Sequence, residues 1–316
     1  MAHRTNATVV STDDNRKSIE LLFPGGVTAE MAMTRQEKYA KIGSKPQVTP
    51  ATIHEDLRGR DFTINALALS LNRASRGLLI DPTNGLGDLE RRELRTVSNH
   101  ALYDHPIRLF RLLRFKMRLG FTVAERTQSQ FENAREAEVE KYITPANLFA
   151  ELKHAASEQN VTEVLQAWDE QKLLQLVSPA LTGAKLNLPG FVKLQKARQL
   201  IPFGLDMPTD DAALFFNLLT EELTPKERSA FMTFLGVDKA TAEYWHKLDV
   251  RASKLEKELV APSVNKPSKI YGLLSKAPGE LPLILLVRST QRAAQDESRA
   301  ISASTFLQPR KLQIKW

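Results

Sequence analysis

The stretch that most constrains the fold is residues 59–69, GRDFTINALAL, where strongly polar side chains interrupt an apolar run. Asp61 and Asn65 are four residues apart, so on a helix they would lie on one face, next to Arg60. A buried helix gains nothing from a charge pair and an amide unless they bind a ligand or one another. The stretch therefore predicts either a polar binding site or a structural ion pair between Arg60 and Asp61.

Composition narrows the class of protein. The chain has 316 residues, with 44 Lys and Arg against 37 Asp and Glu, which gives a net charge of +7 and favours a polyanionic partner. Cysteine is absent, which excludes disulfides and thiolate metal sites. We find no apolar run of about 18 residues that could span a membrane and no signal peptide, and we expect a cytoplasmic protein without a membrane partner.

The chain changes character along its length, from strands to helices. Residues 7–23 predict two short strands around a turn, and residues 81–89, DPTNGLGDL, predict a loop. From about Pro145 onward helices stand almost alone. One should begin at Thr224, where TPKE forms a capping box, and another near Ser268. The expected fold class is α+β and mostly helical.

Residues 103–121, YDHPIRLFRLLRFKMRLGF, form the clearest basic segment. The pattern predicts a helix over 107–119 with leucines on one side and arginines on the other. Asp104 is the sole acidic residue between positions 101 and 120, so the arginines lack an i,i+4 partner. This favours phosphate binding over a merely solvated face. The face comprises Arg108, Arg111, Arg114 and Arg118.

Three segments in this order resemble the class II tRNA nucleotidyltransferase family, which includes CCA-adding enzymes and bacterial poly(A) polymerases. They are EDLRGRDFTINALAL at 55–69, DPTNGLGDLERRELRTV at 81–97 and DHPIRLFRLLRFKMRLGF at 104–121. The resemblance implies a partial nucleotidyltransferase head over residues 1–120, a helical neck over 121–180 and a helical body over 181–316, which is a candidate RNA-binding domain. It also implies transfer of a nucleotide from ATP or CTP to the 3′ end of tRNA or another RNA, with Mg²⁺ as cofactor.

The same resemblance assigns roles to the polar residues of the first segment. Asp61 would accept a hydrogen bond from the ribose hydroxyl, Arg60 would pair with the triphosphate, and Asn65 would face the same pocket. In the third segment the family presents a Glu-Asp-x-x-Arg motif to the nucleobase. Asp104 and His105 align with the Glu-Asp pair of this motif, so a histidine replaces the base-reading aspartate. Arg108 aligns with the arginine of the motif.

The nucleotide-binding set expected from these assignments is therefore Arg60, Asp61, Asn65, Asp104, His105, Arg108, Arg111 and Arg114, with Arg118 assigned to RNA. The loop at 81–89 matches the family's flexible element. There Asp81 and Asp88 are interpreted as carboxylates that fix the loop by accepting hydrogen bonds from backbone amides.

The family's metal-binding carboxylates have no counterpart here. A Gly-Gly-x-x-Arg-Asp turn and an Asp-x-Asp strand are both missing before residue 60, so we assign no catalytic and no metal-binding residues, with Glu20 at most an auxiliary carboxylate. We expect the chain to begin inside the head and to be inactive alone. The alternatives are a non-catalytic RNA- or nucleotide-binding protein derived from the family, or, more weakly, a scaffold for an acidic protein.

Overall fold

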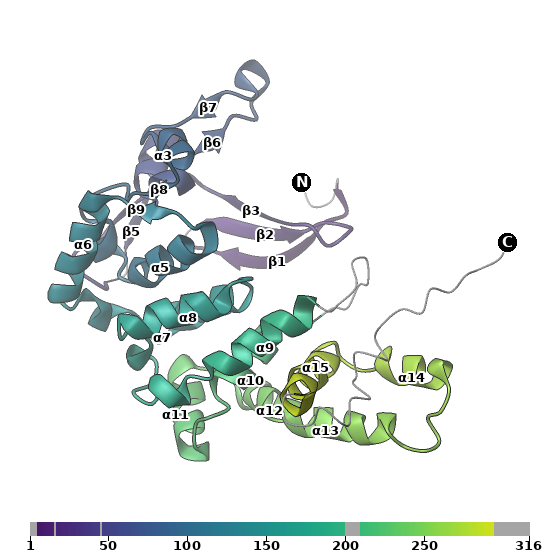
Figure 1. The fold of residues 1–316 in the computed structure, drawn as a ribbon. Helices are drawn as coiled ribbons and strands as arrows, with labels where there is room; N and C mark the ends of the chain where they lie inside the picture. The colour runs from purple at the N-terminus through teal and green to yellow at the C-terminus, as the bar shows by residue number, and fades with distance from the viewer. Residues whose placement is uncertain (1–4, 16, 45, 200–208, 294–316) are drawn as a thin grey trace. The chain divides into compact units, whose positions relative to one another are not determined.

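The computed structural model describes residues 5–15, 17–44, 46–199 and 209–293, and the chain divides into two compact units (Figure 1). The first is Met1–Thr144 and the second is Pro145–Trp316. Strands occur in the first unit, whereas the described part of the second is helical, which agrees with the mostly helical α+β class expected from the sequence.

The chain starts with a three-stranded antiparallel sheet in the order β1-β2-β3. Its strands are β1 (Thr8–Asp13), β2 (Ser18–Leu22) and β3 (Thr28–Ala32), and the first two confirm the predicted hairpin. The central strand holds the one buried side chain of this sheet, Leu21, with an exposed fraction of 2%. The sheet therefore has a narrow apolar contact with the rest of the unit.

A second, two-stranded sheet leads into the first helix. Strands β4 (Arg35–Lys38) and β5 (Gln47–Pro50) are antiparallel, and α2 (Ile53–Arg58) follows with a capping box at its start. The buried Asp56 of α2 accepts a hydrogen bond from the Arg35 amide of β4 at 2.9 Å. This bond holds β4 beside the helix.

Residues 59–69 do not form the helix that their spacing suggested. The Thr63 amide donates to the Arg95 carbonyl at 2.9 Å, and the Val97 amide donates to the Asp61 carbonyl at 3.1 Å. Phe62, fully buried between these bonds, lies in a bridge to the neighbouring chain segment. Backbone groups that pair with a distant segment cannot also form helical bonds. What remains helical is the single turn η1 (Thr63–Asn65).

The predicted loop at 81–89 is half loop and half helix. After the short hairpin of β6 (Ala68–Leu69) and β7 (Leu79–Ile80), which encloses the turn η2 (Arg73–Ser75), the chain enters α3 (Gly85–Arg91). A β-carbon on Gly85 would lie 2.1 Å from the Thr63 carbonyl oxygen, so glycine is required there for α3 to rest on η1.

The first unit closes with helices that pack around a pair of short parallel strands. These elements are β8 (Glu93–Leu94), α4 (Ala101–Asp104), α5 (Arg108–Leu119), β9 (Thr122–Val123), α6 (Glu125–Glu136) and η3 (Val139–Tyr142). The helix predicted over 107–119 is confirmed as α5. Helix α6 packs on α4, so the region from 121 to 144 belongs to the same compact unit as the head. The expected neck boundaries at 120 and 180 stay predictions.

Helices make up the described part of the second unit, 145–199 and 209–293, with two short turns, η4 (Leu174–Leu176) and η5 (Gly183–Lys185), between them. The helices are α7 (Pro145–Ala156), α8 (Val161–Glu170), α9 (Leu188–Gln199), α10 (Asp211–Leu219), α11 (Pro225–Leu235), α12 (Lys239–His246), α13 (Leu248–Leu259), α14 (Pro267–Leu274) and α15 (Glu280–Ala293). Aromatic packing marks the core, where Phe216 stacks on Trp245 with ring centroids 4.6 Å apart.

The predicted start of α11 is confirmed, and it generates a stability prediction. Thr224 Oγ1 accepts from the Glu227 amide at 3.3 Å, and Glu227 Oε2 accepts from the Thr224 amide at 2.9 Å. Thr224→Ala should lower the free energy of unfolding of this unit by about 1 kcal/mol because a helix donor loses its partner. Urea denaturation followed by fluorescence reports this unit, since Trp168 and Trp245 are both buried in it.

Thr224→Ser keeps the hydroxyl and is the matched control, which should unfold close to the urea midpoint of the original chain. Equal midpoints for the Ala and Ser variants would show that the cap contributes nothing to the stability of the helical unit.

Candidate functional site

Asp61 is the centre of the polar cluster in the first unit. Its Oδ1 accepts from the Phe62 amide at 2.8 Å and from Asn65 Nδ2 at 3.1 Å. Its Oδ2 accepts from Arg111 Nε at 2.9 Å and from Nη2 at 2.6 Å. A carboxylate offers about four acceptor positions. All of them are used inside the protein, although the expected partner, Arg60, is not among the donors.

Asp61 is ionised in this setting although it is buried, with an exposed fraction of 6%. Burial by itself raises the pKa of a carboxyl group. Here the charge of Arg111, together with the hydrogen bonds from Asn65, Arg111 and the Phe62 amide, outweighs burial and holds the pKa of Asp61 below its usual value. The cluster is therefore a buried ion pair that links η1 to α5.

The arginine face expected on α5 does not point uniformly to solvent. Arg111 pairs with Asp61, and Arg114 is buried, with an exposed fraction of 4% and its guanidinium 4.7 Å from the centroid of the Phe115 ring. Arg118 is exposed. The neutralising carboxylate, absent from the sequence around α5, comes from a residue 50 positions earlier.

Arg108 joins the same cluster from the start of α5. Its Nη2 donates to the Gly59 carbonyl at 2.8 Å and its Nη1 donates to the Ala101 carbonyl at 3.1 Å. Burial lowers the pKa of Arg108, against the opposing charges of Asp61, Tyr39 and nearby Asp104. Arg108 therefore lies within electrostatic reach of the Asp61 pair while it clamps the end of α2 to α4.

Arg60 and Asn65 lie at the rim of the cluster. The Arg60 guanidinium donates to Asp56 Oδ1 from Nε at 3.0 Å and from Nη2 at 2.8 Å, and half of its side chain is exposed. Asn65 is exposed and touches Asp61 through its amide nitrogen. Both side chains are thus placed where a ligand could reach them.

The two loop carboxylates behave differently. Asp81 accepts from the Gly85 amide at 2.8 Å and the Leu86 amide at 3.0 Å, as predicted for a loop-fixing residue. Asp88 has an exposed fraction of 1% and accepts instead from side chains, namely Thr63 Oγ1 at 2.6 Å and the guanidinium of Arg91 at 2.5 Å. Asp88 therefore ties α3 to the turn that carries Asp61.

His105 lies between α4 and α5 and contacts two residues that sequence reasoning missed. Its Nε2 is 3.2 Å from Glu37 Oε2 and is in hydrogen-bond contact with Tyr39 Oη. Glu37 lies in β4 and Tyr39 directly follows it, in the segment TRQEKY at 34–39, and nothing in the local pattern of this segment indicates the contact. Among the hydrogen bonds of the described residues, none joins the Asp104 side chain to His105.

The described residues do not fit a metal ion. Across 5–15, 17–44, 46–199 and 209–293, no group of three or more His, Asp or Glu side chains could hold one. Glu20, the auxiliary candidate, accepts a hydrogen bond from Ser11 Oγ at 3.1 Å on the exposed β1–β2 surface. We therefore assign none of these residues to the Mg²⁺ that the family resemblance implies.

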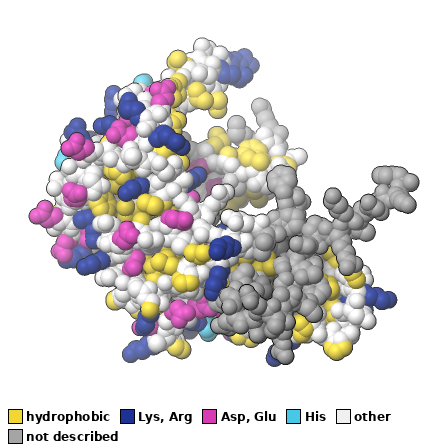
Figure 2. All heavy atoms as spheres, viewed as in Figure 1, with side chains coloured by type: hydrophobic (Ala, Val, Ile, Leu, Met, Phe, Trp, Pro, Cys, Tyr) yellow, Lys and Arg dark blue, Asp and Glu magenta, His cyan; other side chains and the backbone are white. Residues whose placement is uncertain are grey.

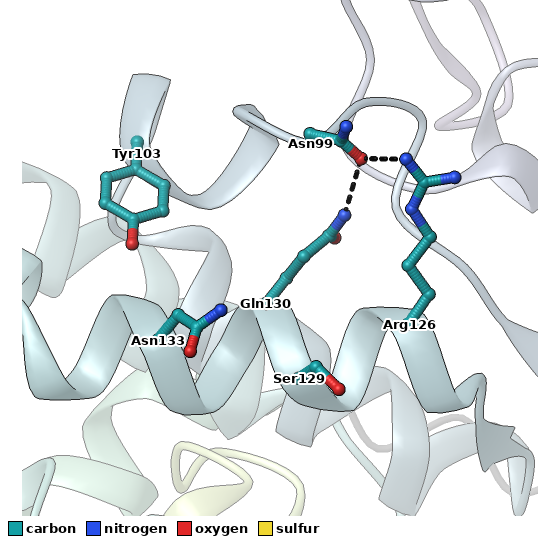
Figure 3. A pocket seen from close by; sticks show the side chains of 6 residues that line it. All are labelled: Asn99, Tyr103, Arg126, Ser129, Gln130 and Asn133. Carbon is teal, nitrogen blue, oxygen red and sulfur yellow. Dashed lines mark hydrogen bonds between the residues drawn. The ribbon is translucent and has the colours of Figure 1, made fainter.

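A separate pocket of about 330 Å³ opens on α6 (Figure 3). Asn99 Oδ1 accepts there from Arg126 Nη2 at 2.6 Å and from Gln130 Nε2 at 3.0 Å. The other lining residues are Tyr103, Ser129 and Asn133. It contains none of the predicted site residues, so this pocket is not where the three sequence motifs meet.

Charge and hydropathy of the described residues add two observations. On the face shown in Figure 2, Lys and Arg side chains are interspersed with Asp and Glu, and no single basic patch covers it. In the described part of the chain, no helix is both long and apolar enough to cross a bilayer. The basic side chains visible on that face are thus spread among acidic ones.

Comparisons with known proteins agree with these motifs. The sequence model of the family described as "Poly A polymerase head domain" matches residues 1–95 of this chain. The A-adding tRNA nucleotidyltransferase of Aquifex aeolicus is 27% identical over 267 residues, which cover 83% of this chain and 32% of that protein. The CC-adding tRNA nucleotidyltransferase of Deinococcus radiodurans is 38% identical over 157 residues, which cover 49% of this chain and 41% of that protein.

Solved structures show the same fold. The crystal structure of a tRNA nucleotidyltransferase complexed with a primer tRNA and an incoming ATP analog has a TM-score of 0.64 at 24% identity, covering 93% of this chain and 83% of that one. This likeness concerns the fold. The chain spans 32% and 41% of the lengths of the two curated relatives named above.

The buried ion pair generates a stability prediction. Arg111→Ala leaves the Asp61 carboxylate buried without its countercharge and should destabilise the first unit by about 3 kcal/mol. Hydrogen–deuterium exchange in peptides from residues 101–120 should speed up accordingly. Lys116→Ala removes an exposed cation from the same helix and is the control, with almost no effect expected. Equal exchange in both variants would mean that the pair does not hold α5 in place.

The same pair gives the first unit a pH-dependent stability. Because the pKa of Asp61 is lower in the folded chain, its contribution is fully present above the unfolded value of about 3.9 and is lost as pH falls through the folded value. Asp61→Asn should be less stable than the original chain at pH 7, and the difference should shrink below about pH 4. A difference independent of pH would contradict an ionised Asp61.

Proposed function

We propose that this chain, which belongs to the class II tRNA nucleotidyltransferase family, binds a ribonucleoside triphosphate and the 3′ end of an RNA as part of nucleotide addition. ATP and CTP are the proposed nucleotides and tRNA the proposed RNA. Support comes from the family match at the head and from relatives named for adding A or CC to tRNA.

One observation carries the proposal, namely the meeting of the sequence motifs at Asp61. The turn that contains Asp61 and Asn65 receives Arg111 from α5, Arg108 clamps the preceding Gly59, and Asp88 fixes the turn from α3. A structural core needs no such concentration of charge, since buried ion pairs often cost as much free energy as they supply. A binding site for a charged nucleotide does need it.

Each residue then has a role that its position allows. A ribose hydroxyl that bonds to Asp61 has to displace one of the four present donors. The Asn65 amide, at 3.1 Å the longest contact and exposed at the rim, is the one we propose it replaces. Arg60, half exposed, is proposed to meet the triphosphate, and Arg118, exposed on α5, the RNA.

Arg111 is proposed to act on the nucleotide through Asp61, and buried Arg114 through its packing against Phe115. His105 and Arg108 are proposed to face the nucleobase, with Asp104 as the alternative carboxylate at that position. These assignments follow the family resemblance residue by residue, and the contacts described above are compatible with them.

The described residues supply nucleotide binding and not the phosphoryl-transfer chemistry. Positioning groups can hold a nucleotide, but transfer also needs the charge on the leaving pyrophosphate to be stabilised. We therefore propose that the 316-residue chain alone adds nucleotides poorly or not at all and that carboxylates outside the described residues complete the enzyme. The cytoplasmic location expected from the sequence stays a prediction.

A second candidate function follows from the same observation. A chain that keeps the recognition cluster without metal ligands could act as a non-catalytic RNA- or nucleotide-binding protein. Assays of nucleotide incorporation into RNA separate the enzyme from the binding protein. A non-catalytic binding protein would gain no activity from any added catalytic segment.

Nucleotide binding by the isolated chain is the direct test. Arg108→Ala should weaken binding of ATP and CTP about tenfold, because a charged donor is lost. Isothermal titration measures this, and labelled ATP should not be incorporated into tRNA in the presence of Mg²⁺.

Arg126→Ala, which changes the pocket on α6, is the matched arginine control and should bind nucleotide normally. Loss of binding in the Arg126 variant alone would move the nucleotide site to α6, and incorporation by the isolated chain would refute its proposed inactivity.

A further inference from the structure

His105 contacts Glu37 of β4 and Tyr39, the residue that follows this strand. The proposed function does not use these two contacts. Its ring meets the Tyr39 ring edge-on, with centroids 4.7 Å apart at an angle of 74°. Nε2 faces both Glu37 Oε2, at 3.2 Å, and the Tyr39 oxygen. About a quarter of the His105 side chain is exposed. The Nε2 edge of the imidazole is thus fixed by the protein, while part of the side chain stays exposed.

The protons in this network can be assigned from the donors and acceptors. Glu37 is ionised, because hydrogen bonds from His105, Tyr39 and Arg35 hold its pKa far below the usual value against the opposing effect of burial. Tyr39 has a single hydroxyl proton and donates it to Glu37 Oε2 at 2.5 Å. The tyrosine oxygen is then left as an acceptor. Both atoms that face His105 Nε2 therefore accept, so Nε2 has to carry a proton.

A neutral imidazole with its proton on Nε2 has its lone pair on Nδ1. Among the residues that the structure describes, no hydrogen bond to His105 Nδ1 is recorded. We propose that Glu37 and Tyr39 hold His105 in the Nε2–H tautomer, so that Nδ1 offers a hydrogen-bond acceptor to the exocyclic amine of cytosine or adenine. The ligand class rests on the proposed function, whereas the tautomer rests on the contacts alone.

This arrangement explains how His105 can take the position at which the family has a base-reading aspartate. A free histidine presents either a donor or an acceptor, and would accept amino and keto bases alike. Fixing the proton on Nε2 removes that ambiguity while the ring is neutral. Glu37 and Tyr39 then act as positioning residues, because they touch His105 and not the nucleotide. Arg108, three residues further on, supplies the donor that complements this acceptor.

The tautomer is tested first, without any nucleotide. In ¹⁵N-labelled chain at pH 8, where an ordinary histidine is neutral, the His105 nitrogen shifts should report the Nε2–H form alone. Glu37→Gln and Tyr39→Phe should shift His105 toward a mixture of tautomers. The exposed His100, close to His105 in sequence, serves as the internal control and should not change. A mixture in the original chain, equal to that of His100, would overturn the proposal.

Base selection is tested second, with CTP and UTP, which differ at ring position 4, an amine against a carbonyl, and at N3, an acceptor against an N–H donor. The original chain should prefer CTP by about two- to tenfold, the value of one hydrogen bond. Glu37→Gln should lose most of this preference, and His105→Asp, which restores an acceptor, should keep it. The double variant Glu37→Gln with His105→Asp should also keep it, because an aspartate needs no tautomer lock.

The outcomes separate the two ideas. If Glu37→Gln binds both nucleotides with an unchanged ratio of CTP to UTP affinity, fixing the His105 tautomer plays no role in base selection. Failure of the original chain to bind either nucleotide would refute the proposed function, while the nitrogen shifts would still decide the tautomer of His105.

Discussion

The buried pair of Asp61 and Arg111 is the interaction on which the rest of the first unit depends. It joins a turn and a helix that are 50 residues apart in sequence, and it does so with a charge that cannot be left unpaired at that depth. Once the pair is fixed, Arg108 can reach the end of α2 and Asn65 is placed at the rim. Under the proposed function, recognition and stability share the same atoms, so a change to the cluster would affect both.

How much of this could be read from sequence depends on how local the causes are. The capping box at Thr224, the helix over 107–119 and the first hairpin were all correctly predicted, because the residues that form them are neighbours. Residues 59–69 were predicted wrongly as helical. Their spacing suggests a helix, but their backbone bonds go to residues 95–97, and a local pattern cannot show that.

The site was predictable as a set of residues and not as a set of contacts. The arginines of α5 were identified, whereas the carboxylate that neutralises Arg111 could not be assigned from the local pattern, because Asp61 comes from elsewhere in the chain. Glu37 and Tyr39 were missed for the same reason, since their segment shows only strand character. Asp88 was expected to bond backbone amides and instead bonds side chains of three other residues, Thr63, Arg91 and Arg95. The roles follow from the family resemblance and stay proposals, whereas the structure adds the long-range contacts between these residues.

The missing β-carbon at Gly85 has a mechanical consequence for the loop that the resemblance describes as flexible. A β-carbon at position 85 would lie 2.1 Å from the Thr63 carbonyl oxygen, so the backbone of α3 lies directly against η1 with no room for a side chain between them. Any larger residue at position 85 would have to push α3 away from the turn that follows Asp61. The glycine therefore sets how closely the loop at 81–89 can approach the polar cluster.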